Sequence, residues 1–253
     1  MEKAAVVNVM RRYEVKYILT KEQLAYLQPR LLERMKIDRY GMTSIASLYY
    51  DTADFFLIRR SIEKPFYKEK LRLRSYGLAK EGSPVYLEIK RKNDGIVYKR
   101  RAASTEEAVE SFLNGGAPLG QAQIERELLA FKEKYGALYP QYLIIYDRVA
   151  YYEEGGDLRL TIDHNPRYRV DDLNLHTSLD GKPLLKEGEA ILEVKAQASI
   201  PLWLCELLTK GRIYPSSCSK VGTAHRLEKK KEARPLIRRY YAEKGERIHG
   251  IAI

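Results

Sequence analysis

Residues 67–76 alternate basic side chains with side chains of other types: Tyr67-Lys68-Glu69-Lys70-Leu71-Arg72-Leu73-Arg74-Ser75-Tyr76. Successive side chains of a β-strand point to opposite faces. One face of this segment therefore carries Lys68, Lys70, Arg72 and Arg74, while Leu71 and Leu73 lie on the other. Adjacent cations repel one another unless an anion lies across them, so the segment is either a solvated strand face or part of an anion-binding site.

The composition of the chain indicates an anionic partner. The 253 residues include 45 Lys and Arg but only 34 Asp and Glu, a formal net charge of +11. Nucleic acid, a phosphorylated small molecule, a polyanion or an acidic membrane surface would each match this charge. Cys205 and Cys218 lack metal-ligand spacing, and no stretch approaches the roughly 20 apolar residues of a membrane helix. With no apolar run at Met1–Met10, we expect a cytoplasmic protein with reduced thiols.

Other segments repeat the alternation of apolar and charged side chains. Their charged faces carry Arg12, Glu14 and Lys16; Glu88, Lys90 and Lys92; Lys99 and Arg101; Arg148; Arg159; and Glu193 and Lys195. Turn signals such as Asn93-Asp94-Gly95 separate neighbouring strands, and helical patterns such as the capping box at Thr20 and Gln23 interrupt them. Hairpins without regular βαβ units predict an α+β fold with an antiparallel sheet.

The helices bear on whether this sheet is open or closed. An open sheet would hold its charged face in water, whereas a closed barrel would turn that face inward. Helices need an apolar surface to cover, and the apolar strand faces supply one. We therefore expect a closed barrel of about eight strands that forms a basic tunnel, with the helices packed outside. We expect one domain over residues 1–230, a last helix at 219–228 and a basic tail over 231–253.

Phosphate is the anion that best fits such a tunnel. Confined cations are costly without compensation, arginine binds phosphate oxygens bidentately, and lysine binds them as a point charge. Glu14, Glu88 and Glu193 would repel phosphate unless a divalent cation bridges the two. Mg²⁺ and Mn²⁺ prefer one or two carboxylates together with water and phosphate oxygens.

Five short motifs, taken together, resemble the VTC domain. They are Arg12-Tyr13-Glu14-Val15-Lys16-Tyr17, Leu71-Arg72-Leu73-Arg74, Leu87-Glu88-Ile89-Lys90, Tyr146-Asp147-Arg148 and Leu192-Glu193-Val194-Lys195. This is the polyphosphate polymerase domain of the vacuolar transporter chaperone complex, and it also occurs as stand-alone bacterial proteins. It belongs to the triphosphate tunnel metalloenzyme, or CYTH-like, superfamily. The resemblance covers roughly residues 8–230.

The resemblance implies an enzyme that uses Mn²⁺ or Mg²⁺ to transfer the terminal phosphate of ATP to a growing polyphosphate chain. The implied catalytic residues are Lys16, Arg72, Arg74, Lys90, Arg148 and Arg159. The implied substrate-binding residues are Lys99, Tyr146, Lys195, Ser219 and Lys220. Glu193 would hold the metal, and Glu14 and Glu88 are either further metal ligands or partners that orient lysines.

Two departures from the family pattern keep other functions open. Ser217 stands where polymerase members carry a further lysine, and Arg12 replaces the first glutamate of the Glu-x-Glu-x-Lys motif of the triphosphatase branch. The alternatives are a triphosphate or nucleotide hydrolase of the same fold and a non-catalytic module that binds polyphosphate, nucleotides or inositol phosphates. No recognised nucleic-acid motif is present, so we expect no nucleic-acid partner. Whether a membrane protein takes up a product stays open.

Overall fold

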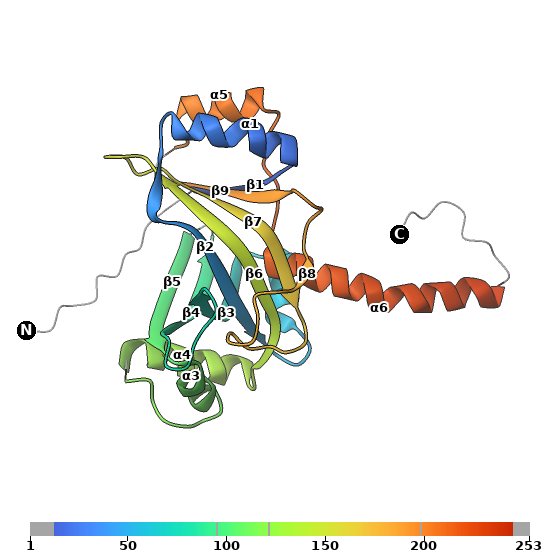
Figure 1. The fold of residues 1–253 in the computed structure, drawn as a ribbon. Helices are drawn as coiled ribbons and strands as arrows, with labels where there is room; N and C mark the ends of the chain where they lie inside the picture. Colours follow the sequence, from blue (N-terminus) through green and yellow to red (C-terminus); the bar gives the residue numbers. More distant parts are fainter. Residues whose placement is uncertain (1–12, 95, 121, 198, 245–253) are drawn as a thin grey trace, which may run out of the picture.

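The computed structural model describes residues 13–94, 96–120, 122–197 and 199–244, which form one antiparallel sheet with helices around it (Figure 1). The strands are β1 (Tyr13–Leu19), β2 (Lys36–Asp51), β3 (Tyr67–Tyr76), β4 (Val85–Asn93), β5 (Ile96–Ser104), β6 (Tyr139–Tyr152), β7 (Arg159–Arg169), β8 (Lys182–Pro183) and β9 (Ala190–Ala196). The helices are α1 (Lys21–Leu32), α2 (Phe56–Ile62), α3 (Glu106–Leu113), α4 (Ala122–Tyr135), α5 (Leu202–Lys210) and α6 (Lys220–Lys244). The predicted α+β class with an antiparallel sheet is confirmed.

The sheet is open, so the expected closure into a barrel is not confirmed. The strands follow the order β1-β9-β7-β6-β2-β3-β4-β5, with β8 on β7. Strands β1 and β5 end this order, and in the part of the chain that the structure describes no backbone pairing joins them. A side-chain contact spans this gap instead: Lys90 on β4, the neighbour of β5, forms an ion pair with Glu14 on β1.

Local sequence signals set several element boundaries. The predicted capping box begins α1: the Gln23 amide donates to Thr20 Oγ1 at 3.2 Å, and the Thr20 amide donates to Gln23 Oε1 at 3.0 Å. Strand β2 is long because a bulge between Ile37 and Met42 lets it continue its pairing with β6 toward its N-terminal end. Strand β7 runs without interruption from Arg159 through Arg169.

Two hydrophobic cores cover one face of the sheet, as the alternation predicts. Leu73 and Leu87 pack with Phe131 of α4, and α3 joins the same core. Leu160 and Leu192 pack in the other core, which includes α1 and α5. Helices α1 and α5 lie together at one end of the molecule, and α3 and α4 lie at the opposite end (Figure 1).

A third core lies on the opposite, charged face of the sheet, which corrects the expectation that every helix packs outside. Ile45 of β2 and Tyr146 of β6 pack there with Ile58 of α2 and Val221 of α6. These two helices therefore block part of the space that we expected to be an open tunnel. Helix α6 continues to Lys244, beyond residue 228 where we expected it to end, and its second half projects away from the sheet (Figure 1).

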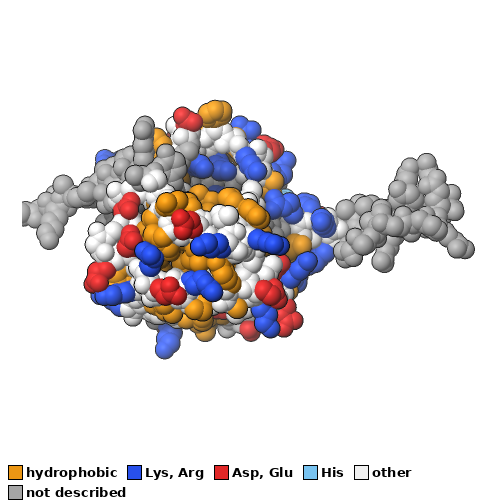
Figure 2. Space-filling model, turned by 90° about the horizontal axis from the view of Figure 1, so that it is seen from above, with side chains coloured by type: hydrophobic (Ala, Val, Ile, Leu, Met, Phe, Trp, Pro, Cys, Tyr) orange, Lys and Arg blue, Asp and Glu red, His pale blue; other side chains and the backbone are white. Residues whose placement is uncertain are grey.

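The face of the molecule on the side of α1 and α5 is dominated by neither positive nor negative charge. Basic, acidic and hydrophobic side chains are interspersed on this face (Figure 2). Of the described helices, none is both long and apolar enough to cross a membrane. Residues 245–253 of the expected tail, and Arg12, lie outside the described residues.

Candidate functional site

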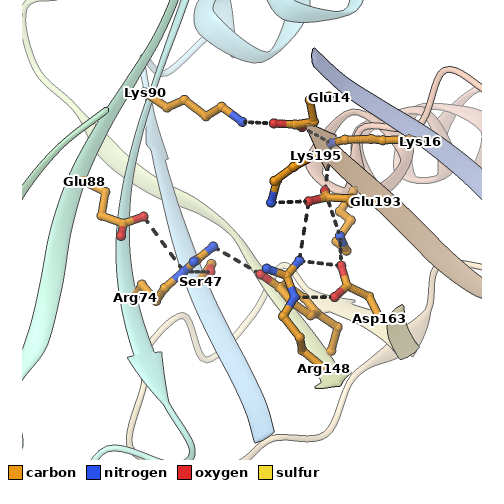
Figure 3. Close-up of polar contacts among 12 residues, drawn as sticks. Glu14, Lys16, Ser47, Arg74, Glu88, Lys90, Arg148, Asp163, Glu193 and Lys195 are labelled. Carbon is orange, nitrogen blue, oxygen red and sulfur yellow. Dashed lines mark hydrogen bonds and ion pairs between the residues drawn. The ribbon is translucent and has the colours of Figure 1, made fainter. Parts of the chain in front are cut away.

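The charged strand faces and the start of α6 enclose a cavity of about 580 Å³, here called the first cavity. Its cations are Lys16, Lys70, Arg72, Arg74, Lys90, Lys99, Arg148, Lys195 and Lys220. The only carboxylates among its described lining residues are Glu14 and Glu193, and Tyr49, Val97, Tyr146 and Ser219 complete the wall. Many of these side chains point toward one another from different strands (Figure 3). All the predicted site residues line this cavity except Arg159 and Glu88.

Strand register explains why these residues converge. Directly opposed residues of antiparallel strands lie on the same face. Arg72 of β3 is opposite Glu88 of β4, and Lys16 of β1 is opposite Glu193 of β9. The alternation along each strand selects the face, and the pairing then places charges from distant parts of the sequence beside one another.

Hydrogen bonds hold Arg72 and Arg74 in place on one wall. Arg72 Nη2 lies 2.7 Å from Glu88 Oε2, and Arg72 Nη1 donates to the Tyr49 hydroxyl at 3.2 Å. Arg74 Nη2 donates to the Tyr146 hydroxyl at 3.1 Å. Burial by itself would raise the pKa of Glu88, but the neighbouring guanidinium groups lower it to about 2. The two arginines are thus oriented before any ligand binds.

Asp163 anchors the opposite wall, and the sequence analysis did not identify it as a site residue. Its side chain is fully buried and accepts from Arg148 Nε at 2.5 Å and from Arg148 Nη2 at 2.8 Å. Lys220, the first residue of α6, also forms an ion pair with this carboxylate. Burial raises the pKa of Asp163, but Lys220 and Arg148 outweigh it and lower the value. One buried carboxylate therefore fixes two cations from different elements.

Glu14 and Glu193 form an acidic strip on the first cavity wall. Lys16 Nζ lies 3.3 Å from Glu14 Oε1 and 3.0 Å from Glu193 Oε1, and Lys195 Nζ lies 3.0 Å from Glu193 Oε2 (Figure 3). Burial opposes ionisation of Glu14, but Lys90 and Lys16 lower its pKa to about 2. The pKa of Glu193 is likewise held well below its usual range by Lys195 and Lys16, against the effect of burial. Both carboxylates are ionised at neutral pH.

A second cavity of about 380 Å³ adjoins the first. The two share the lining residues Glu14, Lys16, Lys70, Lys90, Val97 and Ser219. The second cavity adds the cations Lys64, Lys68, Lys92 and Arg226. The two cavities therefore lie side by side, and cations line both of them.

Two predicted residues lie elsewhere. Arg159 lines neither cavity, because its guanidinium donates to the backbone oxygens of Gly156 and Leu158, at 3.3 and 3.0 Å, outside the site. Glu88 lies behind the wall with a fully buried side chain, where Lys99 Nζ is 2.6 Å from its Oε1 and Arg72 is bound to its Oε2. Of its two predicted roles, orienting cations fits this placement, whereas holding a metal does not.

Tyr49 and Lys70 are further cavity residues outside the predicted set. The alternation in residues 67–76 had already placed Lys70 on the cationic face of that strand, so the sequence contained the information needed to predict it. Tyr49 carried no comparable signal, since β2 is mostly uncharged. Burial raises the pKa of Tyr49, but Arg72 and other nearby cations lower it to about 7.

Fold and site together define an α+β protein whose antiparallel sheet carries a strongly basic cavity with a small acidic strip. The chain belongs to the VTC domain family, whose family model matches residues 11–228. The family identification from the five motifs is thereby confirmed.

Several solved structures are similar to the chain at low sequence identity, and the first of those named below shares its fold. A putative adenylate cyclase from Bacillus halodurans is 15% identical with a TM-score of 0.51, and the match covers 83% of this chain and 96% of that one. A putative adenylyl cyclase from Hippeastrum, described as having a dominant triphosphatase activity, is 17% identical with a TM-score of 0.48, covering 82% and 92%. A putative adenylate cyclase from Vibrio parahaemolyticus is 12% identical with a TM-score of 0.45, covering 85% and 97%. No curated protein matches the chain.

Proposed function

We propose that this chain is a metal-dependent enzyme that transfers phosphoryl groups of nucleoside triphosphates or polyphosphate, and that its main reaction is polyphosphate synthesis from ATP. The observation that carries the proposal is the first cavity, where nine cations face two wall carboxylates among the described lining residues. Such an excess of confined positive charge needs an anion with several negative charges. Membership of the VTC family supports a phosphoanhydride as that anion.

The wall residues have the chemistry that phosphoryl transfer needs. This reaction requires little covalent help from the protein, and positioning with charge stabilisation supplies most of the catalysis. Arg72 and Arg74 present oriented guanidinium groups that bind phosphate oxygens bidentately. Arg148 and Lys220 face them from the Asp163 side and stabilise the charge that develops on the transferred group.

Glu14 and Glu193 are the residues that would hold a divalent metal. They fit one that takes its other ligands from water and phosphate, since both are ionised, both line the cavity, and their shared contact with Lys16 shows that the two carboxylates lie close together. No cluster of three or more His, Cys, Asp or Glu side chains in the described residues could hold a metal by itself. Bound Mg²⁺ or Mn²⁺ would supply positive charge to the phosphate oxygens of the substrate.

Product analysis tests the proposal. The protein is incubated with ATP and either Mn²⁺ or Mg²⁺, and products are resolved by length. Long-chain polyphosphate supports synthesis, and release of short phosphate alone would assign the hydrolase alternative. Glu193→Gln should reduce either activity at least about 100-fold, since a misplacement of the reacting groups by about 1 Å alone can cost that much. If the folded protein produces neither polymer nor released phosphate, the result would contradict catalysis.

A non-catalytic phosphate-binding module is the second candidate. The observation that favours it is that Glu193 already has two lysine partners at 3.0 Å, which compete with a metal. Tight tripolyphosphate binding that needs no metal, is unchanged by Glu193→Gln and occurs without turnover would support this function over the first.

A further inference from the structure

Lys70 differs from the other cations of the first cavity. Each of the other eight has a carboxylate oxygen within 4.0 Å among the described residues. No carboxylate of the described residues lies that close to Lys70, whose hydrogen-bond acceptor is the Ser219 hydroxyl, 3.0 Å from its Nζ. Four cations of the second cavity, Lys64, Lys68, Lys92 and Arg226, also lack such a partner. Lys64, Lys92 and Arg226 are exposed to water, and Lys68, which donates to the Ser61 backbone oxygen at 3.5 Å, does not line the first cavity.

The position of Lys70 is as distinctive as its lack of a counter-ion. It lines both cavities, together with Lys16 and Lys90. Burial, together with the neighbouring Lys16 and Lys90, lowers the pKa of Lys70 to about 8, against the opposite effect of Tyr49. A cation that is only partly exposed to water and is held among other cations is unfavourable in the free protein. Lys70 therefore lies where the two cavities meet.

We propose that Lys70 is a phosphate-binding residue that engages the phosphate group at the junction of the two cavities. This inference rests on the proposed function, because it assumes a linear phosphoanhydride in the cavities. The lysine ammonium would donate to a phosphate oxygen, and Ser219 would keep the ammonium aimed at the junction. The ligand, and no side chain of the protein, then supplies the missing negative charge.

With this role for Lys70, the substitution Lys70→Met should have opposite effects on the stability of the free protein and on ligand binding. Lys70→Met removes an uncompensated charge, so the free protein should be as stable as the wild type or more stable. The same substitution removes a charged hydrogen bond to the ligand, so binding should weaken. A lysine with a structural role would instead lose stability when replaced.

The experiment measures tripolyphosphate affinity and thermal midpoint for the full chain and three variants. Lys70→Met should bind at least about 10-fold more weakly than the wild type, with an unchanged or higher midpoint. Lys70→Arg should retain most of the affinity because it keeps the charge. Lys210→Met, a matched change at an exposed lysine of α5 that lines neither cavity, should lose less than about 3-fold.

The outcomes separate the two proposals. Wild-type affinity in Lys70→Met, or a lower midpoint in that variant, would overturn the role of Lys70 while leaving the proposed function in place. Failure of the wild type to bind either tripolyphosphate or ATP would refute the proposed function, and the role of Lys70 would fail with it. Weaker binding with an unchanged or higher midpoint, restored by Lys70→Arg, supports the inference.

Discussion

Lys90 Nζ lies 3.5 Å from Glu14 Oε2, and this ion pair joins β4 to β1, two strands that do not pair with each other. The sheet is open between its end strands, yet its charged face encloses a cavity. A side-chain contact therefore crosses the gap that backbone hydrogen bonds leave. Glu14 belongs to the acidic strip of the site and also contacts Lys16. The same carboxylate therefore takes part both in the site and in the contact across the gap.

This cross-gap contact should contribute a small, measurable coupling to stability. In a double-mutant cycle with Glu14→Gln and Lys90→Met, we expect a coupling free energy of unfolding of about 0.5–1 kcal/mol, since the pair is partly exposed. Urea unfolding measures it. The exposed Lys36–Glu154 pair on the surface serves as a control and should show almost no coupling. A coupling no larger than the control would contradict a role for Glu14 in holding the gap together.

Asp163→Asn should destabilise the free protein by about 3–5 kcal/mol, because Arg148 and Lys220 would be left buried without their counter-ion. Tripolyphosphate should recover more stability in this variant than in the wild type, since the ligand supplies the missing charge. Urea unfolding with and without ligand tests both points. Asp172→Asn, which removes a mostly exposed partner of Arg169, should cost less than about 1 kcal/mol. Equal losses in the two variants would argue against Asp163 as the anchor of the wall.

Tyr49 should ionise near neutral pH. Burial opposes ionisation, but Arg72, Lys70 and Arg74 lower its pKa to about 7. The ultraviolet absorbance of the phenolate should therefore show one tyrosine titrating near pH 7, and Tyr49→Phe should abolish that step. Tripolyphosphate should move the step to higher pH, because the anion offsets the cations that stabilise the phenolate. A wild-type titration without this step would show that the three cations do not act together on Tyr49.

Glu88 should contribute to acid sensitivity. Its pKa is about 2 in the folded protein against 4.5 for an unperturbed glutamate, so its stabilising contribution is complete above about pH 4.5. That contribution is lost as the pH falls from 4.5 toward 2, because the unfolded chain binds the proton first. Glu88→Gln should thus be less stable than the wild type at pH 7, by about 3 kcal/mol, with a difference that shrinks on acidification. Urea midpoints across this range measure it, and a constant difference would be inconsistent with the lowered pKa.

Arg74 and Arg159 should differ as ligand-binding residues. Arg74 lines the first cavity and is buried, whereas Arg159 is bound to local backbone oxygens outside it. Arg74→Met should weaken tripolyphosphate binding at least about 10-fold, and Arg159→Met should leave it within about 2-fold. Titration calorimetry gives both affinities. A comparable loss in Arg159→Met would mean that the strand end closes over the ligand.

Much of the site was predictable because each strand carries its own signal. The alternation along 67–76 assigned Arg72 and Arg74 to one face without any knowledge of their neighbours, and the same holds for Glu14, Lys16 and Glu193. Asp163 was harder to predict. It lies on the same face as Arg159, but only its register opposite Arg148 turns it into the anchor of the wall.

By itself, the sequence determined the strands, the face on which each charge lies and the family, since these depend on neighbours a few residues apart. Only the tertiary structure decided which charges meet, that the sheet stays open between β1 and β5, and that α2 and α6 occupy part of the charged face. Those outcomes depend on register and packing between distant segments. A lysine such as Lys70 looks like its neighbours in the sequence, and the absence of a nearby carboxylate becomes visible only once the strands are assembled.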